Sequence, residues 1–203
     1  MSIDWELVAI LVGVLVPSVI LHEVSHGVVA LMFGDDTAKR AGRLTLNPIA
    51  HIDPFGTLIL PAMLALTGLG AFGYAKPVPV NPRRLRNPRQ HSLYVSLVGP
   101  GVNIVLAIAA AVVFRVTTPE GLVGDVVLYL GFVNVLLAVF NLLPIPPLDG
   151  SALVERMLPH RWWPVWLRFR QWGFGLLLIV VFLIPGVLRA VFEPALDLWE
   201  KLL

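Results

Sequence analysis

The residues of this sequence best suited to catalysis are His22, Glu23 and His26, in the stretch "LHEVSH". They interrupt an apolar run, 7–33, that is long enough to cross a bilayer as a helix. Residues four apart share one face of a helix, so the two imidazoles can bind a single metal ion. Glu23 is then placed to take a proton from a water molecule that the metal activates. Because an ionisable residue at the centre of a spanning helix costs about 2.5–3.5 kcal/mol, a functional role is expected.

A catalytic zinc site needs a further protein ligand, since such sites have three protein ligands and one open position. Asp149 is the best candidate, in "NLLPIPPLDG" directly after the uncharged run 126–143. The prolines of this motif stop the helix and leave a bent, extended segment. As an alternative or additional role, Asp149 could cap a helix that begins at residue 151. His51 or Asp53, in "HIDPF", are the other candidates for the third ligand.

Three further polar residues are candidates for the site. Asn141 is suited to donate a hydrogen bond to a developing oxyanion or to the substrate backbone. Asn103, in "GPGVN", has two interpretations. The favoured one is that its side chain forms a hydrogen bond between closely packed helices, and the alternative is that it belongs to the site directly. His51 lies beside an Asp-Pro turn and is interpreted first as structural, and second as a contact to substrate or transition state.

The elements that position these residues are expected to be membrane helices. The chain has 203 residues, of which 57% are hydrophobic and 14% charged, against about 25% charged in soluble domains. Uncharged runs cover 93–114, 126–143 and 171–188. The sequence therefore predicts an all-α polytopic membrane protein, a bundle of about four to six hydrophobic helices. The basic residues lack the aromatic interleaving of a nucleic-acid surface, so no nucleic-acid partner is expected.

Two kinds of irregular element are predicted between the helices. Residues 42–47, "GRLTLN", alternate polar and apolar and indicate a short β-strand. Residues 76–80, "KPVPV", are expected to be extended because proline disfavours helix at and before its position. Either segment could hold an unwound substrate by strand addition.

The segment 57–72 is short and contains Pro61, Gly68 and Gly70, so it either spans the membrane or enters and leaves by one face. If it does not cross, the basic loops 34–54, 73–92 and 151–170 all lie in the cytoplasm, as positively charged loops tend to. The metal site indicates the same, because His22 and His26 lie in the C-terminal half of the first helix and Asp149 follows the run 126–143. They can meet at one depth only if an even number of crossings separates them, whereas 57–72, 93–114 and 126–143 would make three. We therefore expect 57–72 to be re-entrant.

Three separated motifs, "HEVSH", "GPGVN" and "NLLPIPPLDG", together resemble the site-2 protease family of intramembrane zinc metalloproteases. "NPIAHIDPFGT" and "AKPVPVNPRRLRNPR" are similar to its compact branch, which lacks PDZ and CBS domains. The resemblance covers nearly the whole chain. It implies that His22, His26 and Asp149 bind one Zn²⁺ per chain, that Glu23 is the catalytic base and that Asn141 lies near the cleavage centre.

The function expected is a zinc-dependent intramembrane endopeptidase, formed by residues 1–203 as a single membrane-embedded domain. Its expected partners are the lipid bilayer and transmembrane proteins, which it would cleave in or near their spanning segments. The expected location is the cell membrane, with several spans and the active site towards the cytoplasm. The alternatives are a non-proteolytic membrane protein with a structural metal site and a metal transporter, although transport favours several ligand clusters and one is apparent. The sequence does not indicate an oligomeric state.

Overall fold

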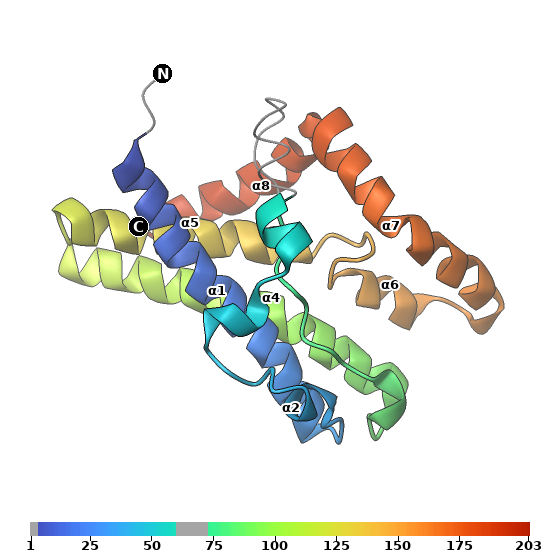
Figure 1. Ribbon diagram of the computed structural model, residues 1–203. Helices are drawn as coiled ribbons and strands as arrows, with labels where there is room; N and C mark the ends of the chain where they lie inside the picture. The colour runs from blue at the N-terminus through green and yellow to red at the C-terminus, as the bar shows by residue number, and fades with distance from the viewer. Residues whose placement is uncertain (1–3, 60–72) are drawn as a thin grey trace.

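The computed structural model describes residues 4–59 and 73–203, which form a bundle of helices (Figure 1). The helices long and apolar enough to cross a membrane are α1 (Trp5–Met32), α4 (Pro88–Thr117), α5 (Gly121–Asn141) and α7 (Trp163–Leu183). The others are α8 (Pro185–Glu200) and the short α2 (Thr37–Arg40) and α6 (Ser151–Met157). This confirms the all-α polytopic membrane fold.

The helix boundaries follow from capping side chains and prolines. The carboxylate of Asp4 accepts hydrogen bonds from the first main-chain N–H groups of α1, and Asn87 caps α4 ahead of Pro88 in the same way. Helix α5 ends at Asn141, shortly before the proline-rich segment 144–147, which cannot continue a helix.

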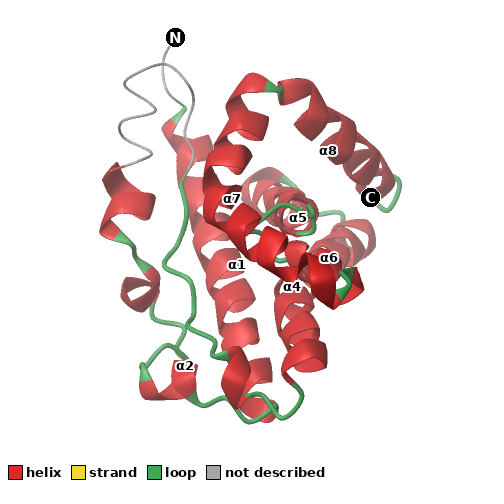
Figure 2. Ribbon diagram, turned by 90° about the vertical axis from the view of Figure 1, so that its right-hand side faces the viewer, coloured by secondary structure: helices red, strands yellow, loops and turns green. Residues whose placement is uncertain are grey.

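Helices α1, α4 and α5 pack on one another and form the centre of the molecule (Figure 2). Helix α8 covers α5, with Trp199 buried against Ala107, Ala111 and Val135. Helix α7 packs against α8 and against the proline-rich turn through Leu177. The turn that carries Asp149 is thereby held between the central helices and α7.

The strand predicted at 42–47 is wrong. These residues form turns, with Gly42 at a φ of 65° and Asn47 capping a short 3₁₀ helix. Arg43 is buried and donates a hydrogen bond to the carbonyl oxygen of Lys76 at 2.6 Å. The alternation of polar and apolar residues in 42–47 therefore arises because this loop packs on the loop that contains Lys76. The described residues contain no β-strand. Residues 76–80 are non-helical, as predicted.

The uncharged run 171–188 is divided between two helices, because α7 ends at Leu183 and Pro185 begins α8. Proline at the first helical position is favoured, so the break falls where the sequence allows a new helix to start.

The segment 57–72 lies mostly outside the described residues. Its flanks are described: the N–H of Tyr74 donates to the carbonyl oxygen of Gly56 at 3.0 Å, and the N–H of Lys76 donates to that of His51 at 2.9 Å. The loops before and after this segment thus lie side by side, which is the arrangement that a re-entrant segment requires. That the segment is re-entrant stays a prediction.

Candidate metal centre

His22, His26 and Asp149 converge although Asp149 follows the second histidine by 123 positions in the sequence. The Nε2 atoms of His22 and His26 lie 3.1 Å and 3.3 Å from the same carboxylate oxygen, Oδ2 of Asp149. One donor atom from each residue lies within 4.8 Å of the others. Two imidazoles and one carboxylate are a ligand set typical of catalytic zinc.

The second nitrogen of each ring is held by a hydrogen bond. Nδ1 of His26 lies 2.5 Å from the main-chain carbonyl oxygen of Val95, and Nδ1 of His22 lies 2.6 Å from Oδ1 of Asn103. A carbonyl oxygen can only accept, so His26 carries a proton on Nδ1, and Nε2 is the nitrogen that faces Asp149 and could bind a metal. Outer partners of this kind orient ligands in metal sites.

The carboxylate of Asp149 provides a test of whether a cation fits here. Its Oδ2 atom is buried without a hydrogen-bond donor and faces Nε2 of His22 and of His26. A buried carboxylate oxygen opposite two nitrogen lone pairs is unfavourable unless a cation lies between them. The residues therefore fit a divalent metal ion.

Glu23 lies beside these ligands at a cavity of about 300 Å³. Its Oε2 atom accepts a hydrogen bond from the main-chain N–H of Val78 at 2.8 Å, so the segment 76–80 passes over the carboxylate. The cavity is lined by His22, Glu23, His26, Val78, Asn141 and Asp149, among others.

The other predicted site residues differ in position. Asn141 lines the cavity, and its amide nitrogen donates to the carbonyl oxygen of Leu137. Asn103 is fully buried, shares a hydrogen bond with His22 and donates another to Asn134 of α5, so it links α1, α4 and α5. Its direct participation in the site stays a prediction. His51 is not among the residues that line this cavity; its Nε2 atom lies 2.9 Å from the carbonyl oxygen of Thr45, within its own loop.

Two glycines allow the close approach of neighbouring elements to the histidines. A Cβ atom on Gly99 of α4 would lie 2.5 Å from Nε2 of His26 and 2.7 Å from Cε1 of His22. A Cβ atom on Gly27 of α1 would lie 2.9 Å from Cγ1 of Val78. The absence of a side chain at these glycines therefore allows α4 and the segment 76–80 to pack this closely against the HEVSH face of α1.

A buried carboxylate anchors the loop that carries Val78. Asp35 accepts hydrogen bonds from the main-chain N–H groups of Thr37 at 3.1 Å and Asn81 at 2.6 Å, and from the Thr37 hydroxyl. Burial raises the pKa of Asp35, but the hydrogen bonds from Thr37 and Asn81 outweigh it, so its pKa lies below its usual range. The ionised carboxylate thus holds the end of α1 to the segment that passes over Glu23.

Three features near the site were missed by the sequence analysis. Ser18 and Asn134 are buried and connect to Asn103. The ion pair between Arg170 and Glu155, at 2.8 Å, lies at the cavity wall and joins α7 to α6. Ser18 had a signal, because it lies one helical turn before His22 on the face that carries both histidines.

Comparison with known proteins identifies the family. The profile described as Peptidase family M50 matches residues 116–184, a part of the chain that includes Asp149. A Bacillus subtilis (strain 168) protein named "Putative zinc metalloprotease YwhC" is 37% identical over 189 residues, covering 89% of this chain and 83% of that protein. The chain belongs to peptidase family M50, the site-2 protease family.

The similarity to a second relative also covers most of this M50 chain. The Mycolicibacterium smegmatis (strain ATCC 700084 / mc(2)155) protein named "Putative zinc metalloprotease Rip2" is 34% identical over 178 residues, covering 87% of this chain and 67% of that protein. No solved structure matches the chain significantly. Membership in this family of zinc metalloproteases identifies zinc as the cofactor. The four long apolar helices found among the described residues indicate an integral membrane protein.

Proposed function

We propose that residues 1–203 form one membrane-embedded endopeptidase domain that hydrolyses peptide bonds in or near transmembrane segments of other proteins. The observation that carries the proposal is the convergence of His22, His26 and Asp149 beside Glu23, at a cavity within a bundle of spanning helices. Among the described residues this is the one cluster of three metal-binding side chains. A transport pathway favours several clusters, so hydrolysis accounts better for the arrangement.

In the proposed mechanism His22, His26 and Asp149 hold the metal, and Glu23 moves the proton. Zinc, when bound, supplies the Lewis acidity that polarises a peptide carbonyl and brings the pKa of a coordinated water down to about 7. Glu23 takes the proton of the attacking water and delivers it to the leaving amine. Asn141 lines the same cavity and is proposed to donate a hydrogen bond to the oxyanion or to the substrate main chain.

The substrate segment must unwind locally before cleavage, because the carbonyl groups of a helix are occupied by internal hydrogen bonds. The non-helical segment 76–80 passes over the cavity and is proposed to lie beside the unwound substrate. The N–H of Val78 already donates to Glu23, so this segment also keeps the carboxylate in place.

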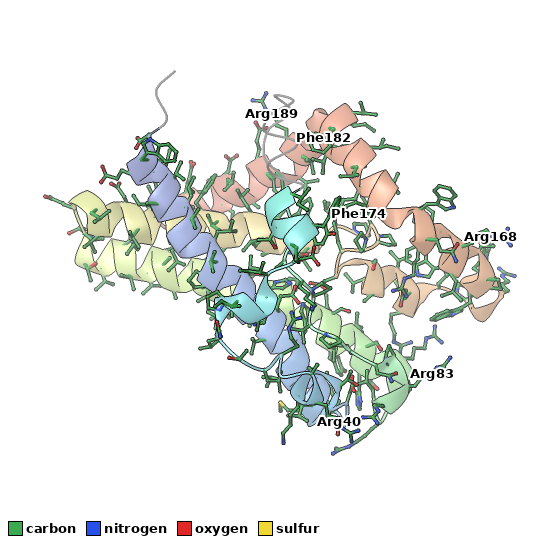
Figure 3. All side chains as sticks on the ribbon, in the orientation of Figure 1. Arg40, Arg83, Arg168, Phe174, Phe182 and Arg189 are labelled. Carbon is green, nitrogen blue, oxygen red and sulfur yellow. The ribbon has the colours of Figure 1, made fainter. Side chains whose placement is uncertain are left out.

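We propose that the protein lies in the cell membrane with the active site towards the cytoplasm. The basic loops 34–54 and 73–92 support this orientation, since they contact one another at one end of the bundle, where Arg40 and Arg83 lie (Figure 3). Loops rich in lysine and arginine favour the cytoplasmic side.

The substitution Glu23→Gln tests the proposed function. Gln retains an acceptor for the Val78 N–H but cannot take a proton, so cleavage should fall by about 10²–10⁴-fold while zinc stays bound. The measurement is cleavage of a panel of single-span test proteins by the purified, lipid-reconstituted protein, with zinc content determined on the same samples.

Glu193→Gln is the control, since Glu193 is an exposed carboxylate on α8 paired with Arg189. It should cleave at the wild-type rate. A Glu23→Gln protein that cleaves as fast as the wild type would refute the assignment of the base. A zinc-loaded wild type that cleaves no member of the panel would count against the endopeptidase function and favour a structural metal site.

A further inference from the structure

A continuous chain of buried hydrogen bonds connects the first helix, α5 and α4 to the metal centre. The amide nitrogen of Asn134 on α5 donates to Oγ of Ser18 on α1 at 2.8 Å. The amide nitrogen of Asn103 on α4 donates to Oδ1 of Asn134 at 2.7 Å, and Oδ1 of Asn103 lies 2.6 Å from Nδ1 of His22. Ser18, Asn103 and Asn134 are 1%, 0% and 0% exposed, respectively. We refer to Ser18, Asn134 and Asn103 as the relay.

The direction of every bond in the relay is determined by main-chain carbonyl groups at its far end. The hydroxyl of Ser18 donates to the carbonyl oxygen of Val14 at 2.7 Å, and the amide nitrogen of Asn134 also donates to that of Leu130 at 2.8 Å. Carbonyl oxygens only accept, so Asn134 must present its nitrogen to them and its Oδ1 to Asn103. Asn103 must then present its own Oδ1 to His22, and that oxygen can only accept a hydrogen bond, so Nδ1 of His22 is the donor.

Asn134 is not among the residues that line the cavity, and its side chain bonds to Asn103, Ser18 and Leu130. We propose that Asn134, acting through Asn103, is a positioning residue that fixes His22 in the tautomer with the proton on Nδ1 and so keeps Nε2 available to zinc. The inference rests on the proposed function in that His22 is taken as a zinc ligand. It assigns to the relay a role beyond packing, namely the choice of which nitrogen of His22 binds the metal.

The two histidines differ in a way that supplies an internal comparison. His26 is held by a main-chain carbonyl, that of Val95, which no side-chain substitution in the relay removes. His22 is held by an amide side chain that could present either its oxygen or its nitrogen, and only the bond to Asn134 selects the oxygen. Loss of Asn134 should therefore affect His22 and leave His26 unchanged.

The first test is Asn134→Leu, which keeps a side chain of similar size but removes both the donor and the acceptor. Partners of metal-bound histidines typically contribute about 10–100-fold to metal affinity, so zinc affinity should fall by about that factor. It is measured by chelator competition on the full-length protein in lipid nanodiscs. Thr117→Val on α4 is the matched control, because it removes a side-chain hydrogen bond to Val113 far from the relay and should leave zinc affinity unchanged.

The protonated nitrogen of each ring is read independently of activity, by ¹⁵N NMR of histidine-labelled, zinc-loaded protein, because without the ion a proton on Nε2 would face the Asp149 carboxylate. In the wild type both His22 and His26 should carry the proton on Nδ1. In Asn134→Leu the His22 signals should shift towards the other tautomer or towards a mixture, while those of His26 stay in place. A wild-type His22 protonated on Nε2 would overturn the inference.

Asn103→Asp bypasses the relay, because a carboxylate accepts from Nδ1 of His22 whatever Asn134 does. Zinc affinity should be retained in Asn103→Asp and reduced about 10–100-fold in Asn103→Leu. The comparison of Asn103→Asp with Asn103→Leu tests the hydrogen bond to His22 even if Asn134→Leu does not fold. In the Asn103→Asp background, Asn134→Leu should cost little zinc affinity.

The outcomes separate the relay from the proposed function. Equal losses from Asn134→Leu in the two backgrounds would show a purely structural role and overturn the relay. Wild-type zinc affinity in Asn134→Leu would overturn it as well. A wild type with no zinc affinity would refute the metal centre on which the proposed function depends, whereas a wild type that binds zinc with an affinity unaffected by Asn134→Leu would refute the relay alone.

Discussion

Gly99 of α4 is packed directly against both histidines of the metal centre. In Gly99→Ala the added methyl group would lie 2.5 Å from Nε2 of His26 and 2.7 Å from Cε1 of His22. Either α4 moves away from α1 or the rings rotate, and both changes spoil the ligand geometry. Zinc affinity should fall by about tenfold or more, and proteolysis should fall with it. The measurement is chelator competition and cleavage on the same preparation.

Gly101→Ala is the matched control, two residues along the same helix. A Cβ atom on Gly101 would have nothing within 4 Å, so zinc affinity and cleavage should match the wild type. Equal behaviour of the two variants would contradict the role of Gly99.

At the residue scale, the sequence indicated the candidate metal ligands but not the side chains that form hydrogen bonds around them. The convergence of His22, His26 and Asp149 could be predicted, because a catalytic metal site needs three such ligands and the chain offers few other candidates. Their roles and that of Glu23 stay predictions. Asn134 could not be predicted, since a lone amide in a helix has many uses and only the packing of α5 on α4 brings it to Asn103.

At the scale of elements, α7 supports the turn that carries Asp149. A Cβ atom on Gly173 would lie 2.5 Å from the carbonyl oxygen and 2.6 Å from Cβ of Pro146. Gly173→Ala should therefore overpack this contact, lower the free energy of unfolding by about 1–3 kcal/mol, and reduce cleavage by displacing the turn. Thermal unfolding and the cleavage assay measure the two effects.

Gly175→Ala on the same helix provides the comparison, because a Cβ atom there meets nothing within 4 Å. It should unfold and cleave like the wild type. If Gly173→Ala also behaves like the wild type, α7 does not support the turn in the way proposed.

The long helices could be predicted because uncharged runs of spanning length have few alternatives in a bilayer. The structure of residues 42–47 could not be predicted from such a run. Its alternation is short, and what decides its structure is a distant partner: the main-chain carbonyl of Lys76 binds Arg43. The break at Pro185 was likewise hidden inside an uncharged run, although proline marked it.

At the scale of the whole molecule, the metal centre joins parts of the chain that are far apart in sequence. His22 and His26 belong to α1, and Asp149 belongs to the turn after α5, with α4 packed against both histidines through Gly99. The carboxylate oxygen that the two rings share has no other partner. A bound zinc ion should therefore act as a cross-link between the first helix and the second half of the bundle.

Metal removal tests this cross-link. A ligand that binds only the folded state stabilises it, by about 2.7 kcal/mol when its free concentration is 100 times Kd. For a chain of this size each kcal/mol corresponds to about 2–4 °C in Tm. EDTA should thus lower the Tm of the wild type by several degrees, and added zinc should restore it. Asp149→Ala should show no zinc-dependent shift, because it severs the link between α1 and the turn. A wild type whose Tm is the same with and without zinc would refute the cross-link, even if the protein cleaves its substrates.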